Sequence, residues 1–313
     1  MEIKQLLHFV KIAEMGNLTR TAGILGLTQA ALSRQLSQLE SELDAELFRR
    51  NGRGLVLTEP GKRLLDHAQI ILRQVGRAQR AVKGEDEPVQ GTLVLGLPPS
   101  LARTIVLPLI EAFKAQLPEA TLRTVDGLSA SMFELVGMGK LDCAVIYNGT
   151  PSDSVELGAL ADEDLFLASG SMPAPNGKAL GSSVGLADIA SLPLISAGGL
   201  NAIHAALANA LADLGKVPNV VHEIANLTAI IDLVRSGHGF AVIPLSGVRS
   251  CIEDTGMRLH RIRKPAVRCS LSIATPARSL RDPLTEKTLV LLREVVRPSL
   301  LQFNKDVEAA IGR

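Results

Sequence analysis

Apolar side chains in the first 57 residues recur every three or four positions, which is typical of short amphipathic helices. The first predicted helix carries an apolar stripe formed by Ile3, Leu6, Leu7, Val10 and Ala13. Gly16 is placed to end this helix. Asn17 can cap a second helix over 18–25, and Thr28 can cap a third. The second and third helices are then joined by a short turn that contains Gly26, which is the arrangement of a helix-turn-helix.

The third predicted helix has an unusual polar face. Its apolar stripe is formed by Leu32, Leu36, Leu39 and Leu43. The opposite face is small near its start and carries hydroxyl and amide groups with one arginine, where a solvated face would carry Glu and Lys. Such a face can enter the major groove of DNA, although an exposed helix rich in Ser and Gln would look the same. The predicted DNA contacts are Thr28, Gln29, Ala30, Ser33, Arg34, Ser37 and Gln38.

A basic hairpin is predicted directly after these helices. Two short apolar pieces, 47–48 and 55–57, flank Asn51-Gly52, and this dipeptide is a strong signal for a two-residue hairpin turn. The hairpin contains three arginines, of which Arg50 and Arg53 are predicted to contact DNA. We expect it to lie along phosphates or in the minor groove as a basic wing.

A long amphipathic helix is predicted next. Thr58 is a good N-cap, and Pro60 sits in the first turn, where a missing N–H is harmless. An apolar seam follows, formed by Leu64, Ala68, Ile71, Val75, Ala78 and Val82. A helix over 59–83 would be about 37 Å long, and such a helix is not expected to bury its seam on the small N-terminal unit alone. We therefore expect a homodimer through this seam, with packing on the chain's own second domain as the alternative, and a linker at 84–88.

The rest of the chain alternates predicted strands and helices. The predicted strands are 92–97, 121–125, 143–147, 192–196, 220–224 and 240–243. The predicted helices are 129–136, about 201–214, 227–235 and one with Leu109, Ile110 and Phe113 on one side. This alternation predicts a parallel, doubly wound α/β sheet. The pattern occurs twice, and the apolar pieces 165–169 and 268–274 could be crossovers between two lobes, as in periplasmic-binding-type domains.

Three polar residues mark a candidate ligand site in this part. Ligands of such sheets bind beyond the carboxyl ends of strands, at helix N-termini, where Ser100, Ser129 and Asn201 are predicted to lie. Helix starts offer free N–H groups and a positive dipole, which suit a carboxylate or another anion. Ordinary N-capping explains each of these side chains equally well.

Charge separates the two parts of the chain. The 313 residues include 33 basic and 32 acidic ones, but residues 1–83 hold 13 of the basic and 8 of the acidic ones. A basic first quarter suggests nucleic acid at that end, unless the unevenness is chance.

Several kinds of site are not expected. The cysteines, Cys143, Cys251 and Cys269, have neither metal nor redox-motif spacing, and Cys143 lies in an apolar strand as an inert core residue, so we expect a reducing cytoplasm and no thiol-based sensing. The six histidines are scattered and no catalytic motif occurs, so neither a catalytic residue, nor a metal, nor a cofactor is predicted. Early charges exclude a signal peptide, and no run approaches the roughly 18 apolar residues of a membrane span.

The run from Phe9 to Leu57 closely resembles the LysR-type transcriptional regulators, and most of all their nitrogen-assimilation-control branch. The matching pieces are the first helix, Leu27-Thr28-Gln29, Ala31-Leu32-Ser33-Arg34, Leu39-Glu40, Leu47-Phe48-Arg49-Arg50 and Leu57-Thr58-Glu59-Pro60-Gly61. Ala30 departs from the family, which usually has proline there, so a base contact made by the proline ring would differ. The resemblance extends more weakly to about residue 300.

The resemblance implies a complete architecture. It consists of a winged helix-turn-helix over 1–57, a long linker helix and hinge over 58–90, and an effector-binding α/β domain over 91–313. The first lobe of that domain would cover about 91–161 and 268–300, and the second about 162–267. The family forms dimers that commonly pair into tetramers, and the implied partners are double-stranded DNA, a small-molecule effector and RNA polymerase, with no membrane. Cleft-lining positions are implied at Ser100, Ser129, Tyr147, Asn201 and Ile203.

Three functions compete on the sequence. The first is a DNA-binding transcription regulator that responds to a small polar or anionic metabolite. The second is a solute-binding protein without a DNA role, which would need a signal peptide and would have no use for residues 17–57. The third is an α/β enzyme, for which the sequence shows neither a nucleophile motif nor a metal motif. The sequence favours the regulator.

Overall fold

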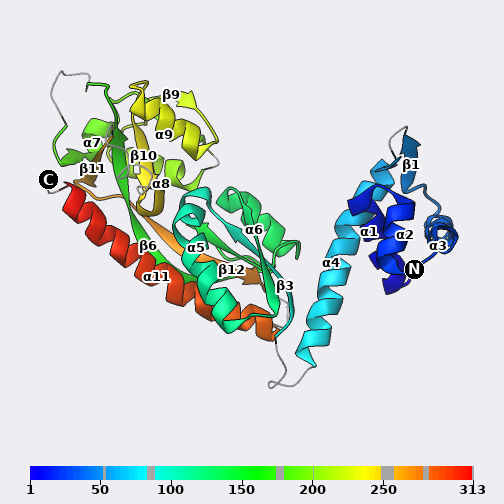
Figure 1. Cartoon of the computed structure of the whole chain (residues 1–313). Helices are drawn as coiled ribbons and strands as arrows, with labels where there is room; N and C mark the ends of the chain where they lie inside the picture. Colours follow the sequence, from blue (N-terminus) through cyan, green and yellow to red (C-terminus); the bar gives the residue numbers. More distant parts are fainter. Residues whose placement is uncertain are drawn as a thin grey trace. The chain divides into compact units, whose positions relative to one another are not determined.

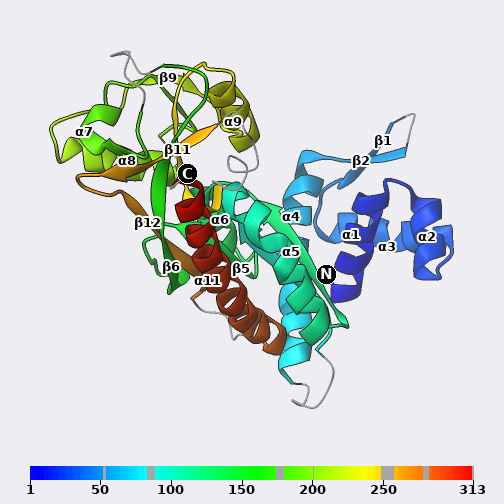
Figure 2. The ribbon, with the colours of Figure 1, turned by 60° about the vertical axis from the view of Figure 1, so that its left-hand side comes forward.

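The structure is a computed structural model of the whole chain and describes residues 1–51, 54–82, 89–173, 180–199, 201–247, 257–277 and 282–311. Its contacts divide the chain into two compact units, Met1–Glu85 and Asp86–Arg313. Both are drawn in Figure 1, and Figure 2 shows them turned by 60°. Each unit has a hydrophobic core of its own.

The first unit is a winged helix-turn-helix, as the sequence predicts. Its elements are α1 (Ile3–Met15), α2 (Leu18–Leu25), α3 (Gln29–Glu42), β1 (Phe48–Asn51), β2 (Gly54–Leu57) and α4 (Glu59–Ala81). The predicted caps of α2 and α3 are confirmed. The Asn17 side chain accepts a hydrogen bond from the backbone N–H of Arg20 at 3.0 Å, and Thr28 Oγ1 accepts one from Ala31 at 3.1 Å. The glycines that end α1 and α2 have left-handed φ angles of 61° and 65°.

Helices α1, α2 and α3, the wing and the first half of α4 share one core. Its buried members are Leu6, Phe9, Val10, Ile12, Ala22, Leu32, Leu36, Leu39, Leu47, Phe48 and Ala68. Leu43 was predicted to belong to this core, and that prediction is wrong: it is the C-cap residue of α3 and stays 38% exposed. Ile3 and Leu7 of the predicted α1 stripe are also exposed, because the buried face of α1 is centred on Leu6, Phe9 and Val10.

The wing is an antiparallel hairpin whose register differs by one residue from the predicted one. The predicted turn was Asn51-Gly52, whereas Asn51 pairs with Gly54, so that residues 52 and 53 separate the strands and lie outside the described residues. Contact with the rest of the unit explains this register. Leu55 donates a backbone hydrogen bond to the carbonyl of Gly16 at 2.8 Å, and a Cβ on Gly54 would lie 2.5 Å from that same carbonyl oxygen.

Helix α4 begins at the predicted cap and packs its first half into the first unit. Thr58 Oγ1 accepts a hydrogen bond from the N–H of Gly61 at 3.1 Å. Ala68 is fully buried in the core of the unit, and Leu64 and Ile71 pack partly against that core. The first unit therefore covers the first half of the seam.

The second half of the seam remains outside this core. Val75 is half-buried, Ala78 is exposed, and Val82 is 86% exposed. The linker predicted at 84–88 lies outside the described residues.

The second unit has the two lobes that the sequence predicts. The first lobe contains β3 (Gly91–Leu97), α5 (Pro99–Gln116), β4 (Ala120–Asp126), α6 (Ser129–Gly137) and β5 (Cys143–Tyr147). The second contains β7 (Ser183–Gly185), α7 (Leu186–Ile189), β8 (Leu194–Ser196), α8 (Ala202–Ala212), β9 (Val220–Glu223), α9 (Leu227–Arg235), β10 (Ala241–Pro244) and β11 (Arg258–Arg263). Short β7 and α7 and strand β11 were not predicted. In α5, Leu109 and Phe113 are buried, but Ile110 was wrongly placed on their side and is 37% exposed.

Two long strands connect the lobes. β6 (Val155–Ser169) pairs with β12 (Arg268–Pro276) through its first ten residues and with β10 and β11 through its last five. The strand order is β4-β3-β5-β12-β6-β11-β7, and β10 also pairs with β6, whereas β8 and β9 form a small sheet of their own. The sheet was predicted to be parallel but is mixed, because β6 and β12 run antiparallel to the strands beside them.

Helix α11 (Pro283–Ile311) was not predicted as an element. It runs along one side of the second unit in both views (Figures 1 and 2). Leu284, Leu292 and Val296 lie in the large core of this unit, and Val307 lies in the core that the second lobe builds with α9 and β10. Among the described residues, no helix combines the length and the apolar character that crossing a membrane requires.

Candidate DNA-binding surface and effector cavity

The polar face of α3 is accessible along its whole length. Six of the seven predicted contact residues on it are exposed, and Ser33 is half-buried. The buried stripe of Leu32, Leu36 and Leu39 on the opposite side fixes this orientation. Arg34 is the only basic residue on the face, and its Nε lies 3.4 Å from the carbonyl oxygen of Ala30 one turn earlier.

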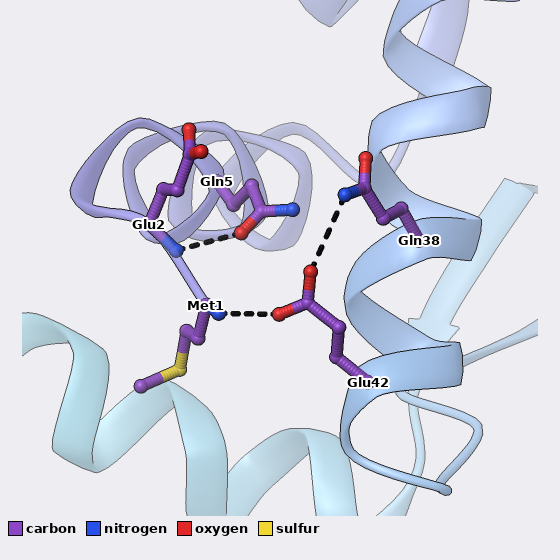
Figure 3. A network of polar contacts seen from close by, with 5 residues as sticks. All are labelled: Met1, Glu2, Gln5, Gln38 and Glu42. Carbon is purple, nitrogen blue, oxygen red and sulfur yellow. Dashed lines mark hydrogen bonds and ion pairs between the residues drawn. The ribbon is translucent and has the colours of Figure 1, made fainter.

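Neighbouring side chains hold two amides of this face. Thr19 of α2 donates a hydrogen bond to Oε1 of Gln29 at 3.2 Å, which ties the first turn of α3 to the preceding helix. Gln38 donates to Glu42 at 3.3 Å. Figure 3 shows that Glu42 also contacts the amino group of Met1, so one carboxylate links the start of α1 to the end of α3. Hydrogen bonding from that amino group is the main reason why the pKa of Glu42 is lowered.

Glu40 joins α3 to the wing. Its Oε1 accepts hydrogen bonds from the backbone N–H groups of Leu47 at 2.8 Å and Phe48 at 3.3 Å, where β1 begins. The same segment is held from α4, because Thr58 Oγ1 donates to the carbonyl of Glu46 at 2.6 Å. A Cβ on Gly61 would lie 2.1 Å from the carbonyl oxygen of Leu47, so only glycine allows this approach. The start of the wing is thus held by hydrogen bonds with both α3 and the N-cap of α4.

The wing presents arginine to solvent. Arg50 lies on β1 opposite Leu55 and is exposed. Arg53, the other predicted wing contact, lies outside the described residues.

A cavity of about 870 Å³, including its open mouth, lies between the two lobes of the second unit. The first lobe contributes the starts of α5 and α6 and the end of β5, and the second contributes the end of β8, the starts of α8 and α9 and β10. All five predicted effector positions line it, namely Ser100, Ser129, Tyr147, Asn201 and Ile203. The remaining lining is largely apolar, and it contains neither a carboxylate, nor a lysine, nor an arginine among the described residues.

The two predicted serines of this lining, Ser100 and Ser129, do not cap their helices. Ser100 Oγ lies 3.2 Å from the hydroxyl of Tyr147, and Ser129 Oγ accepts a hydrogen bond from the backbone N–H of Tyr147 at 3.0 Å. The N-cap positions of α5 and α6 are instead Pro98 and Leu128, which make no side-chain cap and also line the cavity. Capping as the explanation for the two serines is therefore wrong.

Asn201 does cap its helix. Its Oδ1 accepts hydrogen bonds from the N–H groups of Ile203 at 2.9 Å and His204 at 3.3 Å. His204 also lines the cavity, and its Nδ1 lies 2.8 Å from the hydroxyl of Ser196.

A buried polar cluster lies behind Tyr147. The Tyr147 hydroxyl lies 2.9 Å from Ser246 Oγ and donates to Glu163 Oε2 at 3.3 Å. Ser246 donates to the same oxygen from its N–H at 3.2 Å and from its hydroxyl at 3.1 Å. Thr104 of α5 donates to the Ser246 carbonyl at 2.9 Å, so several of these bonds join the first lobe to the segment after β10.

Burial shifts the pKa values of this cluster. Glu163 has no exposed surface, and loss of hydration raises the pKa of its carboxyl from 4.5 to about 7. Burial and the nearby Glu163 carboxyl raise the pKa of Tyr147 well above its usual value, so the phenol stays neutral. Burial also raises the pKa of the Cys269 thiol to about 11, which makes this cysteine a poor nucleophile.

The described residues include few other side chains that could form a catalytic or metal-binding site. Cys143 and Cys269 are buried free thiols, and Cys251 lies outside the described residues. His260 is buried between Ser169 and the carbonyl of Gly181, and burial lowers its pKa. No group of three or more His, Cys, Asp or Glu side chains that could hold a metal occurs in the described part of the chain.

Two family models match almost the entire chain. The model "Bacterial regulatory helix-turn-helix protein, lysR family" matches residues 3–62, and "LysR substrate binding domain" matches residues 86–297. The chain belongs to the LysR family. It is accordingly a DNA-binding transcription regulator with an effector-binding domain, and the alternative of a solute-binding protein finds no support.

Similar proteins cover nearly the full length. The nitrogen assimilation regulatory protein nac of Escherichia coli is 34% identical over 303 residues, which cover 96% of this chain and 97% of that protein. The transcriptional regulator DgdR of Burkholderia cepacia is 35% identical over 79% of both chains. The solved structure of full-length CbnR with its target DNA has the same fold, with a TM-score of 0.68, 24% identity, and coverage of 96% of this chain and all of that one. The relatives are transcription regulators, not enzymes.

Sequence reasoning on this LysR-family chain missed four contributors to the two sites. Glu40 was noticed only as part of the resemblance, and its spacing of seven and eight residues from its N–H partners is no standard capping signal. His204 had a usable signal, because it stands three residues after the helix cap Asn201, in the first turn. Glu163 and Ser246 had none, because they reach the cluster only through the fold.

Proposed function

We propose that this regulator binds a small polar or anionic metabolite in the cavity between its lobes and that this binding alters transcription from specific DNA sites. One observation carries the proposal: α5 and α6 both begin at the cavity without a side-chain cap. The first N–H groups of a helix lack acceptors within the helix and carry a partial positive charge. A carboxylate or another anion can satisfy both starts at once.

The proposed ligand contacts combine these helix starts with side chains around them. Ser100, Ser129 and Tyr147 supply hydroxyl or backbone groups from the first lobe. Asn201 and Ile203 line the cavity from the second lobe. Because the described lining has neither a lysine nor an arginine, recognition rests on hydrogen bonds and helix dipoles. This favours a small ligand with an apolar body over a highly charged one.

On the DNA side, we propose that α3 lies in the major groove. Arg34 and Gln38 would reach base edges, helped by Thr28, Gln29, Ala30, Ser33 and Ser37. Arg50, with Arg53, would contact phosphates or the minor groove. The solved CbnR structure, which shares the fold, was determined with its target DNA, and this supports DNA binding by such a chain.

We further propose a homodimer through the exposed second half of the α4 seam, and a homotetramer built from two such dimers. The exposed Ala78 and Val82 continue the apolar seam beyond the part that the first unit covers. A regulator of this kind would work in the cytoplasm, contact RNA polymerase and carry out no reaction of its own.

Effector binding can change DNA binding only if the ligand prefers one arrangement of the protein over another. Ser100 tests this link, because it is 7% exposed and its helix start faces the cavity. Ser100→Leu is expected to fill this end of the cavity, abolish the thermal shift by any small carboxylate, and remove the effector response in a promoter reporter. Basal DNA binding should remain, because the substitution lies outside the first unit.

Ser191→Leu is the matched control, since Ser191 is exposed in the same unit and does not line the cavity. It should leave both readouts unchanged. A Ser100→Leu protein with a normal response would place the effector elsewhere, and loss of basal DNA binding would mean that the two units are more tightly coupled than proposed.

A further inference from the structure

Glu163 is the most unusual ionisable group of the second unit. It lies on β6, the long strand that pairs with strands of both lobes, and it is fully buried. Its two oxygens differ sharply. Oε2 is within hydrogen-bond distance of the Tyr147 hydroxyl and of both the N–H and the hydroxyl of Ser246, whereas Oε1 has no hydrogen-bond partner among the described residues.

Among the described residues, no positively charged group acts on this carboxyl. The titratable groups that face it are the Tyr147 phenol from β5 and the Cys269 thiol from β12, both uncharged at neutral pH. Helix α5 contributes only hydroxyls to the cluster, from Ser100 and Thr104. A buried carboxylate with one unsatisfied oxygen and no cation is costly, so the structure favours a proton on this group.

The proton has one good position. A proton on Oε2 can be donated to the hydroxyl oxygen of Tyr147 or Ser246, 3.3 and 3.1 Å away, whereas a proton on Oε1 would find no acceptor among the described residues. Burial also holds the pKa of Glu163 at about 7, so both protonation states are populated near neutrality.

The two states order the hydrogen bonds in opposite directions. An ionised carboxylate only accepts, so Tyr147 donates to Glu163 and its oxygen accepts from Ser100, 3.2 Å away. The Ser100 hydrogen is then directed away from the cavity. A protonated carboxyl donates a hydrogen bond to the Tyr147 hydroxyl. That hydroxyl can then donate its own hydrogen bond to Ser100 Oγ. The Ser100 hydrogen is thereby released toward the cavity that Ser100 lines.

We propose that Glu163 is a positioning residue that sets the hydrogen-bond direction of the effector cavity, so that the cavity takes up a carboxylate ligand together with one proton. This inference rests on the proposed effector site and extends it. It assigns the ligand class as a hydrogen-bond acceptor, and it makes the response of the regulator depend on pH.

The size of the effect follows from the fraction of protein in the competent state. If only protonated Glu163 permits tight binding and its pKa is about 7, the apparent affinity should fall about tenfold between pH 6 and pH 8. A neutral ligand of the same shape does not require protonated Glu163, so its affinity should fall little between pH 6 and pH 8.

The single tyrosine of this chain allows a direct test without any ligand. The sequence contains one tyrosine and no tryptophan, so the tyrosine signals in ultraviolet resonance Raman spectra of the full chain come from Tyr147 alone. The ring doublet, whose intensity ratio reports whether the phenol mainly donates or accepts, should change between pH 6 and pH 8, with a midpoint near 7. Glu163→Gln should abolish this change, and Glu156→Gln, an exposed position on the same strand, should preserve it.

Acetate, succinate and glutarate, with succinamide as the neutral probe, then test the ligand step by calorimetry. Wild-type affinity for the carboxylates should fall with rising pH, and Glu163→Gln should remove that dependence. Tyr147→Phe provides a second variant: it interrupts the hydrogen-bond chain while retaining Glu163, and it should also flatten the pH profile.

The outcomes separate the two proposals. A Tyr147 doublet that does not change with pH, or a carboxylate affinity that is constant or rises with pH, would overturn the role of Glu163 while leaving the effector site intact. A doublet that titrates in a protein to which no small anion binds would refute the effector site but not the titration of the cluster.

Discussion

The two sites of this regulator are built in opposite ways. The DNA-binding surface consists of largely exposed side chains on one face of α3, and its amides Gln29 and Gln38 are held by residues on the adjacent helix or close in sequence. The effector cavity is assembled from segments between residues 98 and 244, and the polar cluster around Glu163 behind it is deeply buried. An exposed reading surface can release its hydrogen bonds to DNA at little cost. A buried cluster cannot, so changes there alter affinity, protonation and stability together.

Helix α4 combines both kinds of environment within one element, and the largest predicted effects lie there. Ala68 is fully buried in the core of the first unit, so Ala68→Glu buries a charge without a partner and should cost several kcal/mol, about 3–5. Thermal unfolding should show loss of the first unit and of DNA binding. A variant that retained both would mean that this helix can shift without loss of the core.

Ala78→Glu is the contrasting substitution on the same seam. Ala78 is exposed in the single chain, so the fold should survive while association through α4 fails. Light scattering at tens of micromolar should report smaller particles than wild type with an unchanged melting temperature of the first unit. A soluble wild-type monomer under these conditions would remove the basis for the dimer proposal.

The next effect concerns the buried cluster of the second unit. The pKa of Glu163 is about 7 in the folded state against 4.5 when unfolded, so the folded state binds more protons between these values and stability falls as pH rises through them. The loss should amount to about 3 kcal/mol and be complete above the folded pKa. Denaturant unfolding of wild type and Glu163→Gln from pH 4.5 to 8 tests this, with Glu156→Gln as control. Parallel pH profiles for wild type and Glu163→Gln would show that Glu163 keeps an ordinary pKa.

The same contrast explains what could be predicted from the sequence. Asn17 and Thr28 cap helices through N–H groups three residues away, and the leucine stripe of α3 lies within one helix, so a short window contains the whole signal. The helix starts at the cavity were predictable for the same reason. The contacts of Glu163 were not, because Tyr147 is 16 residues away and Ser246 is 83 residues away, and no periodicity joins them.

The errors in the fold have equally specific causes. The wing register depends on the fit of Gly54 against Gly16, a contact between distant segments that overrides the turn preference of Asn51-Gly52. Helix α11 contains Pro298, which predicts a helix end, yet the helix continues because Val307 is buried against the second lobe. The sheet is mixed because β6 and β12 return between the lobes, which an alternation of strands and helices does not reveal.

On the DNA-binding surface, the largest predicted loss comes from Arg34. In the free protein its Nε makes only a long contact, 3.4 Å, with the Ala30 carbonyl, so the side chain is available to a base edge. Arg34→Ala should cost about 1–3 kcal/mol on the specific site and much less on random DNA. Mobility-shift assays with the specific site and with random DNA measure the ratio of the two affinities. Equal losses on the two DNAs would make Arg34 a phosphate contact instead.

The smallest predicted effect belongs to Arg50 and tests whether the wing acts differently from α3. Arg50 is exposed on β1, and hydrogen bonds with Glu40 and Thr58 hold the backbone where that strand begins. A phosphate contact contributes mainly through counterion release, which gives a slope of about 0.9 in log affinity against log salt for each contact. Arg50→Ala should therefore reduce the salt slope by about that amount and weaken specific and random DNA alike, by only a few fold at 0.15 M salt. Arg50→Lys should restore the slope, because a phosphate contact requires the charge and not the fork of the guanidinium. If Arg50→Lys bound specific DNA as weakly as Arg50→Ala and bound random DNA normally, Arg50 would be contacting bases. The distinction between a base-contacting α3 and a phosphate-contacting wing would then be wrong.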